Sequence, residues 1–311
     1  MAAEGPLAHD APLQIRAVTF NTGIPQCSRN PEAEYSCDDA ETASEWYGTG
    51  LSHRALFPDT TRFLAAMDAD VIGIQEIFHP GECPEIPEEF HEGFICEGWQ
   101  PGDPTVAQQI LGSGYQIACH PGRPDKCIAV KRDFGRIRGC KGDLCLDHLE
   151  AGSTSDCGGG TRIARGIIDL RRGGSLTVVN IHGTSGVTGA DQNCRAQQLE
   201  QVFVDIRDGS GEPAANGRRN IVLGDINTDP GRFPFAAGAM VWNRFVGEQA
   251  PFRQISEAGL LAPPTHPTGA ELVNIDHVAS DAFDGTCFVG DPTEIRAYDH
   301  SPIVCDLREL P

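Results

Sequence analysis

The sequence predicts an α/β fold in which two β-sheets pack face to face and helices cover their outer sides. Short apolar runs rich in β-branched residues recur along the 311 residues, each bounded by Gly, Pro, Asn or Asp. Several runs, including VIGI, LTVV and IVLG, are continuously apolar, as expected of strands that are covered on both faces. Helical patterns are fewer, and no repeat or low-complexity linker divides the chain. These features favour a sandwich of packed layers.

Ten segments have the composition of strands. Each combines β-branched, aromatic or other apolar residues and is bounded by turn-forming residues. The predicted strands are residues 13–20, 70–77, 115–119, 127–131, 164–171, 175–182, 219–225, 273–279, 286–289 and 302–307.

Three segments are predicted helices. The clearest spans residues 191–207, where apolar residues recur at helical spacing and Asp191 is the candidate N-cap. Residues 58–69 and 251–260 are the other two. Between the predicted elements lie long irregular stretches that contain cysteines, and we expect them to form a rim around a site.

The cysteines indicate an exported, disulfide-bonded protein. There are twelve, an even number without a CxxC pair, which favours disulfides over zinc. A reduced protein with buried thiols is the alternative. Short separations across predicted loops suggest two of the pairs, Cys119 with Cys127 and Cys287 with Cys305.

The chain is expected to form one domain over residues 13–311, preceded by an N-terminal extension over residues 1–12. The extension has no basic end followed by an apolar core, so it is interpreted as a mature start and not as a signal peptide. No stretch approaches the roughly 20 apolar residues that cross a bilayer. We therefore expect no stable membrane insertion.

The formal net charge is −20, which disfavours tight nonspecific binding to nucleic acid or anionic membranes. The charge is uneven, because residues 101–200 hold half of the basic side chains. Residues 123–141 could form a local basic face, together with Arg162, Arg165, Arg171 and Arg172. The alternative is that these charges are simply solvated.

Polar residues follow five apolar runs, where the interior of a strand would not tolerate them. Taken singly, such residues are most often turn residues that cap their own backbone. The motifs are TFNTG with Asn21, IGIQE with Glu76, VVNIHG with Asn180 and His182, VLGDIN with Asp225 and Asn227, and the pair NIDHV with Asp276 and YDHSP with Asp299 and His300.

Together and in this order, the motifs resemble the endonuclease/exonuclease/phosphatase superfamily, which includes deoxyribonuclease I and bacterial sphingomyelinases. The resemblance runs from about residue 13 to residue 307, and its most specific part is GDIN at 224–227 followed by DHSP at 299–302. It implies a four-layer α/β sandwich of two mixed β-sheets that forms a single catalytic domain. It also implies a divalent metal, usually Mg²⁺, with Mn²⁺ or Ca²⁺ as alternatives, and hydrolysis of a phosphate ester by an in-line water.

Three residues are candidate metal ligands. Mg²⁺ prefers hard oxygen ligands and needs only one or two protein carboxylates. Glu76 is the best candidate, with Asn21 beside it through its carbonyl oxygen. By resemblance, Asp299 adds a contact.

Five further residues are candidate catalytic groups. Asp225 would orient or deprotonate the water, and Asn227 would hold a phosphate oxygen through its NH₂. His300 would act as an acid or base on the phosphate, and the family pattern places Asp276 on its other ring nitrogen. His182 would donate to the phosphate or to the leaving group. Such a collection of charges would be costly in a core with nothing to bind.

Some residues depart from the family. Tyr298 and Ile226 stand where Ser and Phe are frequent, and Thr184 and Ser185 could bond a phosphate or merely cap a turn. The substrate therefore cannot be carried over from any one relative. Ordinary surface or loop roles are expected for the histidines outside the motifs, which are His53, His79, His91, His120, His148, His266 and His277.

Three functions remain open. A secreted nuclease, slightly favoured, would grip the nucleic-acid backbone with its basic middle third. A phospholipase C or sphingomyelinase-type enzyme would act on a phospholipid headgroup, and aromatic residues within 233–245 would touch the bilayer surface or pack in the core. A non-catalytic binding module is the least favoured, since every motif is retained.

Overall fold

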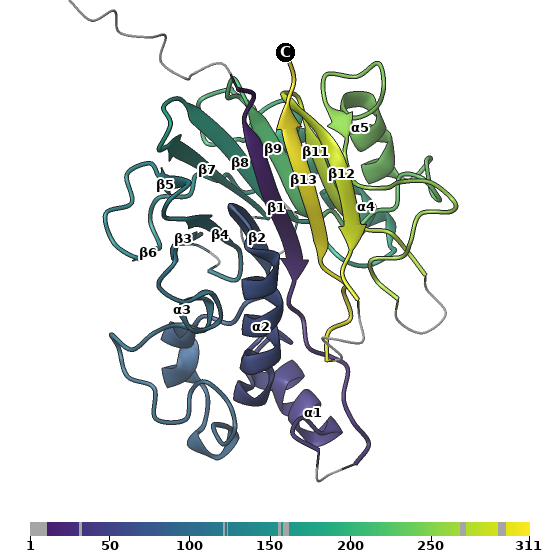
Figure 1. Cartoon of the computed structure of the whole chain (residues 1–311). Coiled ribbons are helices and arrows are strands. Elements are labelled where there is room, and N and C mark those ends of the chain that lie inside the picture. The colour runs from purple at the N-terminus through teal and green to yellow at the C-terminus, as the bar shows by residue number, and fades with distance from the viewer. Residues whose placement is uncertain are drawn as a thin grey trace, which may run out of the picture.

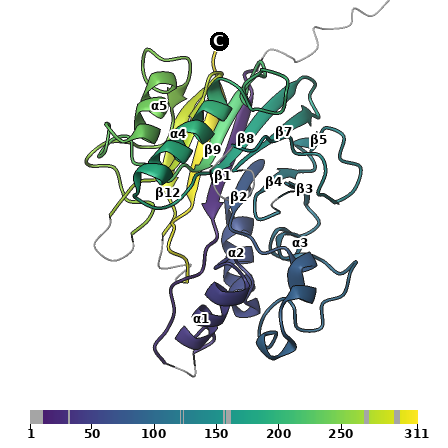
Figure 2. The same cartoon turned by 180° about the vertical axis from the view of Figure 1, so that it is seen from behind.

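The computed structural model contains two β-sheets packed face to face, with helices on both outer sides (Figures 1 and 2). Residues 1–10 of the expected extension and Arg123 of the basic segment lie outside the described residues. The structure describes residues 11–30, 33–120, 122, 124–154, 157, 162–267, 272–291 and 297–311.

The first sheet has the strand order β12-β13-β1-β2-β4-β3-β6. β1 and β2 are parallel, and so are β3 and β6, whereas the other neighbours are antiparallel. Its strands are β1 (Gln14–Asn21), β2 (Val71–Gln75), β3 (Tyr115–Cys119), β4 (Cys127–Lys131), β6 (Leu144–Cys145), β12 (Phe283–Val289) and β13 (Ile303–Glu309).

The second sheet has the order β10-β11-β9-β8-β7-β5. Only β8 and β9 are parallel among the described strands of this sheet, so both sheets are mixed, as predicted. Its strands are β5 (Gly135–Ile137), β7 (Ile163–Leu170), β8 (Ser175–His182), β9 (Asn220–Asp225), β10 (Arg253–Gln254) and β11 (Asp276–Ser280).

Helices complete the four layers. α1 (Cys37–Trp46), α2 (Phe57–Met67) and α3 (Val106–Leu111) share a buried cluster with the first sheet. α4 (Gly189–Phe203) and α5 (Ala237–Phe245) pack on the second, in front of it in Figure 2. Short 3₁₀ helices lie at Arg54–Leu56, Pro80–Glu85 and Glu88–Phe90.

Strand alternation explains the continuous apolar runs. In β2, Ile72 and Ile74 contact the helical layer, whereas Val71 faces the other sheet. The sheets approach closely at Gly73, where an added Cβ would lie 2.0 Å from Leu223 Cδ1. Central strands with both faces covered must be apolar on both faces, and the runs VIGI and IVLG meet that demand.

One polar link crosses the gap between the sheets. Asn180 of β8 donates to the carbonyls of Ile74 and Cys127, both at 2.9 Å, and its Oδ1 accepts from Gln75 Nε2 at 2.5 Å. Its side chain is completely buried and fully bonded. Asn180 is therefore an internal tie between the layers, although its motif placed it with the residues that end strands.

All ten predicted strands are present, with boundaries shifted by a few residues. The prediction of a helix at 251–260 is wrong, because this segment contains the short edge strand β10. The N-cap of α4 is Thr188 and not Asp191, which instead completes a capping box with Thr188. The prediction also lacked α1, α3 and α5 and the short strands β5, β6 and β10.

Six disulfides are formed, and the two predicted pairs are confirmed. Cys119 and Cys127 face each other across β3 and β4, and Cys287 and Cys305 across β12 and β13. The other four pairs are Cys27–Cys37, Cys83–Cys96, Cys140–Cys145 and Cys157–Cys194. The pairs Cys27–Cys37 and Cys83–Cys96 lie in the long irregular stretches after β1 and β2. They crosslink these stretches, as expected of loops that form a rim around a site.

Candidate active site

The ends of four strands bring the site together. β1 ends at Asn21 beside Gln75 of parallel β2, so Glu76 follows directly. In the second sheet, the register pairs His182 at the end of β8 with Asp225 at the end of β9. Since parallel strands end at the same edge of their sheet, these side chains meet where the two sheets face each other.

Asn21 joins carboxylates that come from different sheets. Its Nδ2 lies 3.0 Å from Glu76 Oε1 and 3.1 Å from Asp225 Oδ2. Its Oδ1 accepts the backbone N–H of Gly23 at 3.0 Å. In this orientation Asn21 holds the two carboxylates through its NH₂, and ligating a cation through the expected carbonyl oxygen would require the amide to rotate.

Asp225 lies in a dense network. Asn227, which has a left-handed backbone at φ 50°, donates its backbone N–H and Nδ2 to Asp225 at 2.7 and 2.9 Å. Asp276 of β11 is its direct antiparallel partner. Burial, joined by the nearby negative charge of Asp276, raises the pKa of Asp225 despite the positive charge of His300. A carboxylate with a raised pKa is suited to accepting a proton from water.

His300 is nearly buried and charged. Its Nδ1 lies 2.7 Å from Asp276 Oδ2, and its Nε2 faces Asp225 Oδ2 at 3.7 Å. Burial acts to lower its pKa, but the charges of Asp276 and Asp225 outweigh burial and raise the pKa to about 10. Asp276 thus takes the place beside His300 that the family pattern assigned to it.

Glu76 and His182 lie on the other side of Asn21 and Asp225 from His300 and line the cleft. His182 Nε2 lies 3.3 Å from Glu76 Oε1, and Thr49 Oγ1 donates to Glu76 Oε2 at 3.2 Å. Burial opposes ionisation of Glu76, but the hydrogen bonds from His182 and Asn21 and the positive charges of the histidines lower its pKa to about 2. Glu76 is therefore a permanent anion near neutral pH.

Glu76 and Asp299 border a small space above Gly23. A Cβ on Gly23 would lie 2.6 Å from Glu76 Oε2 and 3.3 Å from Asp299 Oδ1, so only glycine leaves this space open. Among the described residues, Asp299 Oδ1 is buried without a hydrogen-bond partner. Two carboxylate oxygens around an open space, one with unused acceptor capacity, fit a divalent cation.

The sequence interpretation did not include two contributors to the site. Thr49 comes from the irregular stretch after β1, and nothing in its neighbourhood distinguishes it from a loop residue. His266, to which an ordinary role was assigned, lies 3.6 Å from Asp299 Oδ2 and packs edge-on against His300. It forms one possible metal-binding group with Asp299 and His300.

Other polar residues prove structural. Thr184 accepts from Gln198 Nε2 at 2.7 Å, which makes it an anchor for α4. His277 is completely buried between Ser256, Gln254 and the carbonyl of Asn274, and burial lowers its pKa to about 4. The expectation of a surface or loop role is therefore wrong for His277, which is buried within β11.

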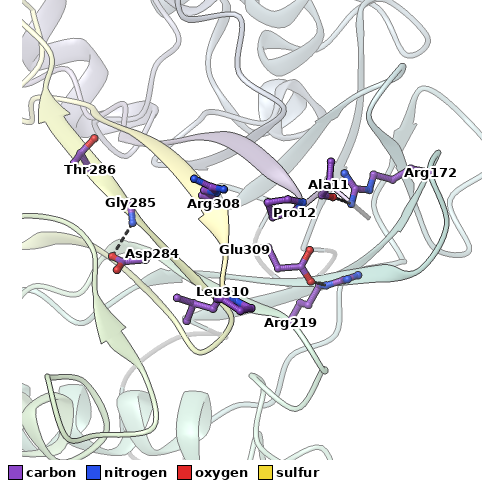
Figure 3. A pocket seen from close by; sticks show the side chains of 11 residues that line it. Ala11, Pro12, Arg172, Arg219, Asp284, Gly285, Thr286, Arg308, Glu309 and Leu310 are labelled. Carbon is purple, nitrogen blue, oxygen red and sulfur yellow. Dashed lines mark hydrogen bonds and ion pairs between the residues drawn. The ribbon is translucent and has the colours of Figure 1, made fainter. Parts of the chain in front are cut away.

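A cleft of about 360 Å³ opens beside Glu76 and His182, and Ser185, Arg162 and Trp46 also line it. A larger cavity of about 860 Å³ lies at the other end of β1 and β13 (Figure 3). Its arginines are partly engaged: Arg219 pairs with Glu309, and Arg172 donates to the carbonyl of Ala11. Of these two cavities, the smaller cleft lies next to the candidate catalytic residues.

Five of the ten described bases of the candidate basic face form ion pairs with neighbouring acids. Arg162 lines the active-site cleft, but Arg171 and Arg172 donate to backbone carbonyls. The ion pairs are Lys126–Asp125, Lys131–Asp68, Arg132–Asp143, Arg138–Asp169 and Arg165–Glu150. These pairs reduce the net positive charge of the face.

Solved structures named as endonuclease/exonuclease/phosphatase proteins have the same fold. One from Bacteroides vulgatus has a TM-score of 0.56 at 13% identity, covering 96% of this chain and 100% of that one. One from Beutenbergia cavernae has 0.55 at 15%, covering 95% and 72%. ANGEL2, a 2′,3′-cyclic phosphatase, has 0.52 at 13%, covering 96% and 95%. No protein-family model and no curated protein sequence matches the chain. The predicted four-layer fold is confirmed.

Proposed function

We propose that this protein is a metal-dependent hydrolase of phosphodiester bonds. The observation that carries the proposal is the meeting of Glu76, Asp225 and His300 through Asn21, from strands and loops far apart in the sequence. Shared fold supports it, since ANGEL2 is a phosphatase. The site also combines an ionised carboxylate, a carboxylate of raised pKa and a protonated imidazole. These groups can hold a cation, accept a proton from water and stabilise the charge that develops on the phosphate.

The roles follow from the contacts. Glu76 and Asp299 would hold the cation, with Asn21 as a third candidate after rotation of its amide. The bound ion, Mg²⁺ or Mn²⁺, would neutralise a non-bridging phosphate oxygen. Asp225, fixed by Asn227, would position and deprotonate the attacking water. His300, oriented by Asp276, and His182 would donate to the phosphate and to the leaving oxygen.

We propose an extracellular location. Six disulfides join all twelve cysteines, and such a density is typical of proteins that work outside the reducing cytoplasm. In the described part of the chain, no helix is both long and apolar enough to span a bilayer.

Different surface features of the protein favour two substrate classes, nucleic acids and phospholipid headgroups. A nucleic acid would use Arg162 at the cleft, but ion pairs along 124–138 offset part of the positive charge that favoured a nuclease. A phospholipid headgroup is favoured by exposed apolar side chains on the loop after β9, where Phe233 and Phe235 are 55% and 87% exposed. By contrast, Trp242 from the same aromatic stretch is buried against Phe203.

The test is an Asp225→Asn substitution assayed on plasmid DNA, RNA, sphingomyelin and a chromogenic bis-phosphodiester, each with Mg²⁺ or Mn²⁺ and with chelator. We expect turnover to fall by about 10³-fold or more, because Asn cannot accept the proton. Asp306→Asn, on the exposed face of β13, is the matched control and should retain full activity. Wild-type turnover in Asp225→Asn, or no metal-dependent cleavage of any substrate by the wild type, would contradict the proposal.

A further inference from the structure

Four large apolar side chains are exposed on two loops that leave the second sheet. Phe233 and Phe235 lie between β9 and α5, and Leu260 and Leu261, which are 76% and 98% exposed, follow β10. The two loops touch, because a Cβ on Gly231 would lie 2.3 Å from a backbone nitrogen of the second loop. The four side chains therefore form one surface, here called the apolar loop surface. Scattered apolar residues are common on proteins, whereas a group of this kind indicates contact with an apolar partner.

Hydrogen bonds join the two loops to each other and to the strand that carries Asp276. Arg232 donates to the carbonyl of Ala262 and to the carboxylate of Asp229, both at 2.7 Å. The buried Asp229 carboxylate also accepts the backbone N–H of Asn274, two residues before Asp276. The apolar loop surface is therefore attached to the side of the active site that Asp276 forms.

The first loop can leave water at little cost to its backbone. Among residues 230–236, Pro230 and Pro234 have no N–H. Four others donate their N–H inside the protein, three of them to Asp229 and one to the carbonyl of Phe233. An N–H that loses water without gaining another acceptor is costly, so a loop with internal acceptors is suited to an apolar phase.

The apolar loop surface is almost neutral in a protein whose formal net charge is −20. Arg232 is the only charged residue in 230–236 and 258–264, and its guanidinium is paired with the Asp229 carboxylate. An acidic protein is repelled by an anionic bilayer, and a paired cation does little to offset that repulsion. An electrically neutral lipid surface is therefore the partner that matches these loops.

We propose that the apolar loop surface docks the protein on a zwitterionic phospholipid layer. Its four side chains enter the layer at the level where headgroups meet acyl chains. The proposal rests on the hydrolase function proposed above, and it names a lipid surface as the partner that presents the phosphodiester to the site.

The test measures vesicle binding by the full-length protein in the presence of chelator, so that no lipid is hydrolysed. Flotation with phosphatidylcholine vesicles is carried out on the wild type and on the double variant Phe235→Ser/Leu261→Ser. We expect the double variant to bind at least about 100-fold more weakly, because each lost side chain contributes about tenfold. Equal binding of the two proteins, or no binding of the wild type, would overturn the proposal.

Val204→Ser is the matched control in the same experiment. Val204 is also exposed, to 48%, and it follows the last residue of α4. Because β8 and β9 are parallel, the connection that contains α4 runs back from the site to the opposite end of the sheet. Val204 therefore lies away from the apolar loop surface, and its substitution should change vesicle binding by less than about twofold.

A second measurement tests the preference for neutral lipid. Vesicles of equal parts of phosphatidylcholine and phosphatidylserine should bind the wild type more weakly than vesicles of phosphatidylcholine alone. Added salt should reduce the difference, because it screens the repulsion between the acidic protein and the anionic lipid. Tighter binding to the anionic vesicles would overturn the proposal.

A third variant guards against misfolding of the double variant. Phe235→Trp keeps a large aromatic ring at an exposed position, and its emission should shift to the blue when phosphatidylcholine vesicles are added, because the indole leaves water. The shift is measured as the difference from the wild type, which contains three tryptophans. No additional shift in Phe235→Trp would also overturn the proposal.

Docking and hydrolysis can fail separately. The double variant should cleave the soluble chromogenic bis-phosphodiester at the wild-type rate, since that substrate needs no docking. Absence of vesicle binding, with cleavage still lost in Asp225→Asn, would overturn the docking proposal and leave the hydrolase function intact. Sedimentation velocity tests another occupant: a wild-type dimer that the double variant converts to a monomer would mean that a second copy covers the surface, and would overturn the proposal.

Discussion

His300 keeps a positive charge in a nearly sealed site because two carboxylates surround it. Its pKa in the folded protein is raised to about 10, above the usual 6.5. A raised pKa means that the charged imidazole stabilises the fold fully below pH 6.5, and that this stabilisation is lost as the pH rises to about 10. Asp276 contributes most to this effect, so the His300–Asp276 pair contributes to stability as well as to chemistry.

The consequence can be measured in metal-free protein. The difference in unfolding free energy between the wild type and His300→Gln should be largest near pH 6 and should shrink steadily toward pH 10. Urea unfolding of both proteins at a series of pH values gives this difference. Groups far from His300 titrate equally in the two proteins, so their contributions cancel. A difference that is independent of pH would show that folding does not change the pKa of His300.

The sequence could identify most residues of the site, because polar groups that end apolar runs are conspicuous. It could not distinguish Asn180 from His182, which are two residues apart and share one face of β8. The difference comes from the opposite sheet. It still covers Asn180, which bonds to the Ile74 carbonyl, whereas His182 lies beyond its edge and lines the cleft. His266 was hidden for another reason: it follows no apolar run, and its position depends on contacts with distant segments.

At the scale of elements, α4 begins at an exposed capping box. Thr188 Oγ1 accepts the backbone N–H of Asp191, whose carboxylate accepts the backbone N–H of Thr188. Thr188→Ala should lower the unfolding free energy by about 1 kcal/mol, because it leaves an N–H without its acceptor. Thr188→Ser, which retains the hydroxyl, should restore most of the loss in the same urea titrations. Equal stability of the alanine and serine variants would show that the cap contributes nothing.

The elements that were predicted well carry a clear apolar pattern. α2 and α4 bury a stripe of side chains, and the central strands are apolar on both faces. α1 buries only Ala40 and Ala43, so its sequence shows no stripe. In 251–260 the buried residues Phe252 and Ile255 are three apart and imitate a helix, while pairing of Arg253 and Gln254 with β11 makes the segment extended.

At the scale of the whole molecule, the six disulfides differ in the length of chain that they close. Cys157–Cys194 has a sequence separation of 37, whereas Cys140–Cys145 has a separation of 5. In the chain-entropy account, replacing the first pair with serines should cost about 1.7 kcal/mol more than replacing the second. Guanidinium unfolding of the two double variants measures this difference. A reversed order would mean that native contacts, and not loop length, determine the contribution of each disulfide.

Asn180 also determines how the two sheets can move. For one sheet to slide over the other, its amide would have to release two carbonyls and Gln75 inside a dry interface. Glu76 is the residue after Gln75, and His182 lies two residues beyond Asn180 on the same strand. These hydrogen bonds therefore resist sliding of one sheet over the other close to the cleft. They keep the two walls of the cleft at a constant spacing while substrate and product pass between them.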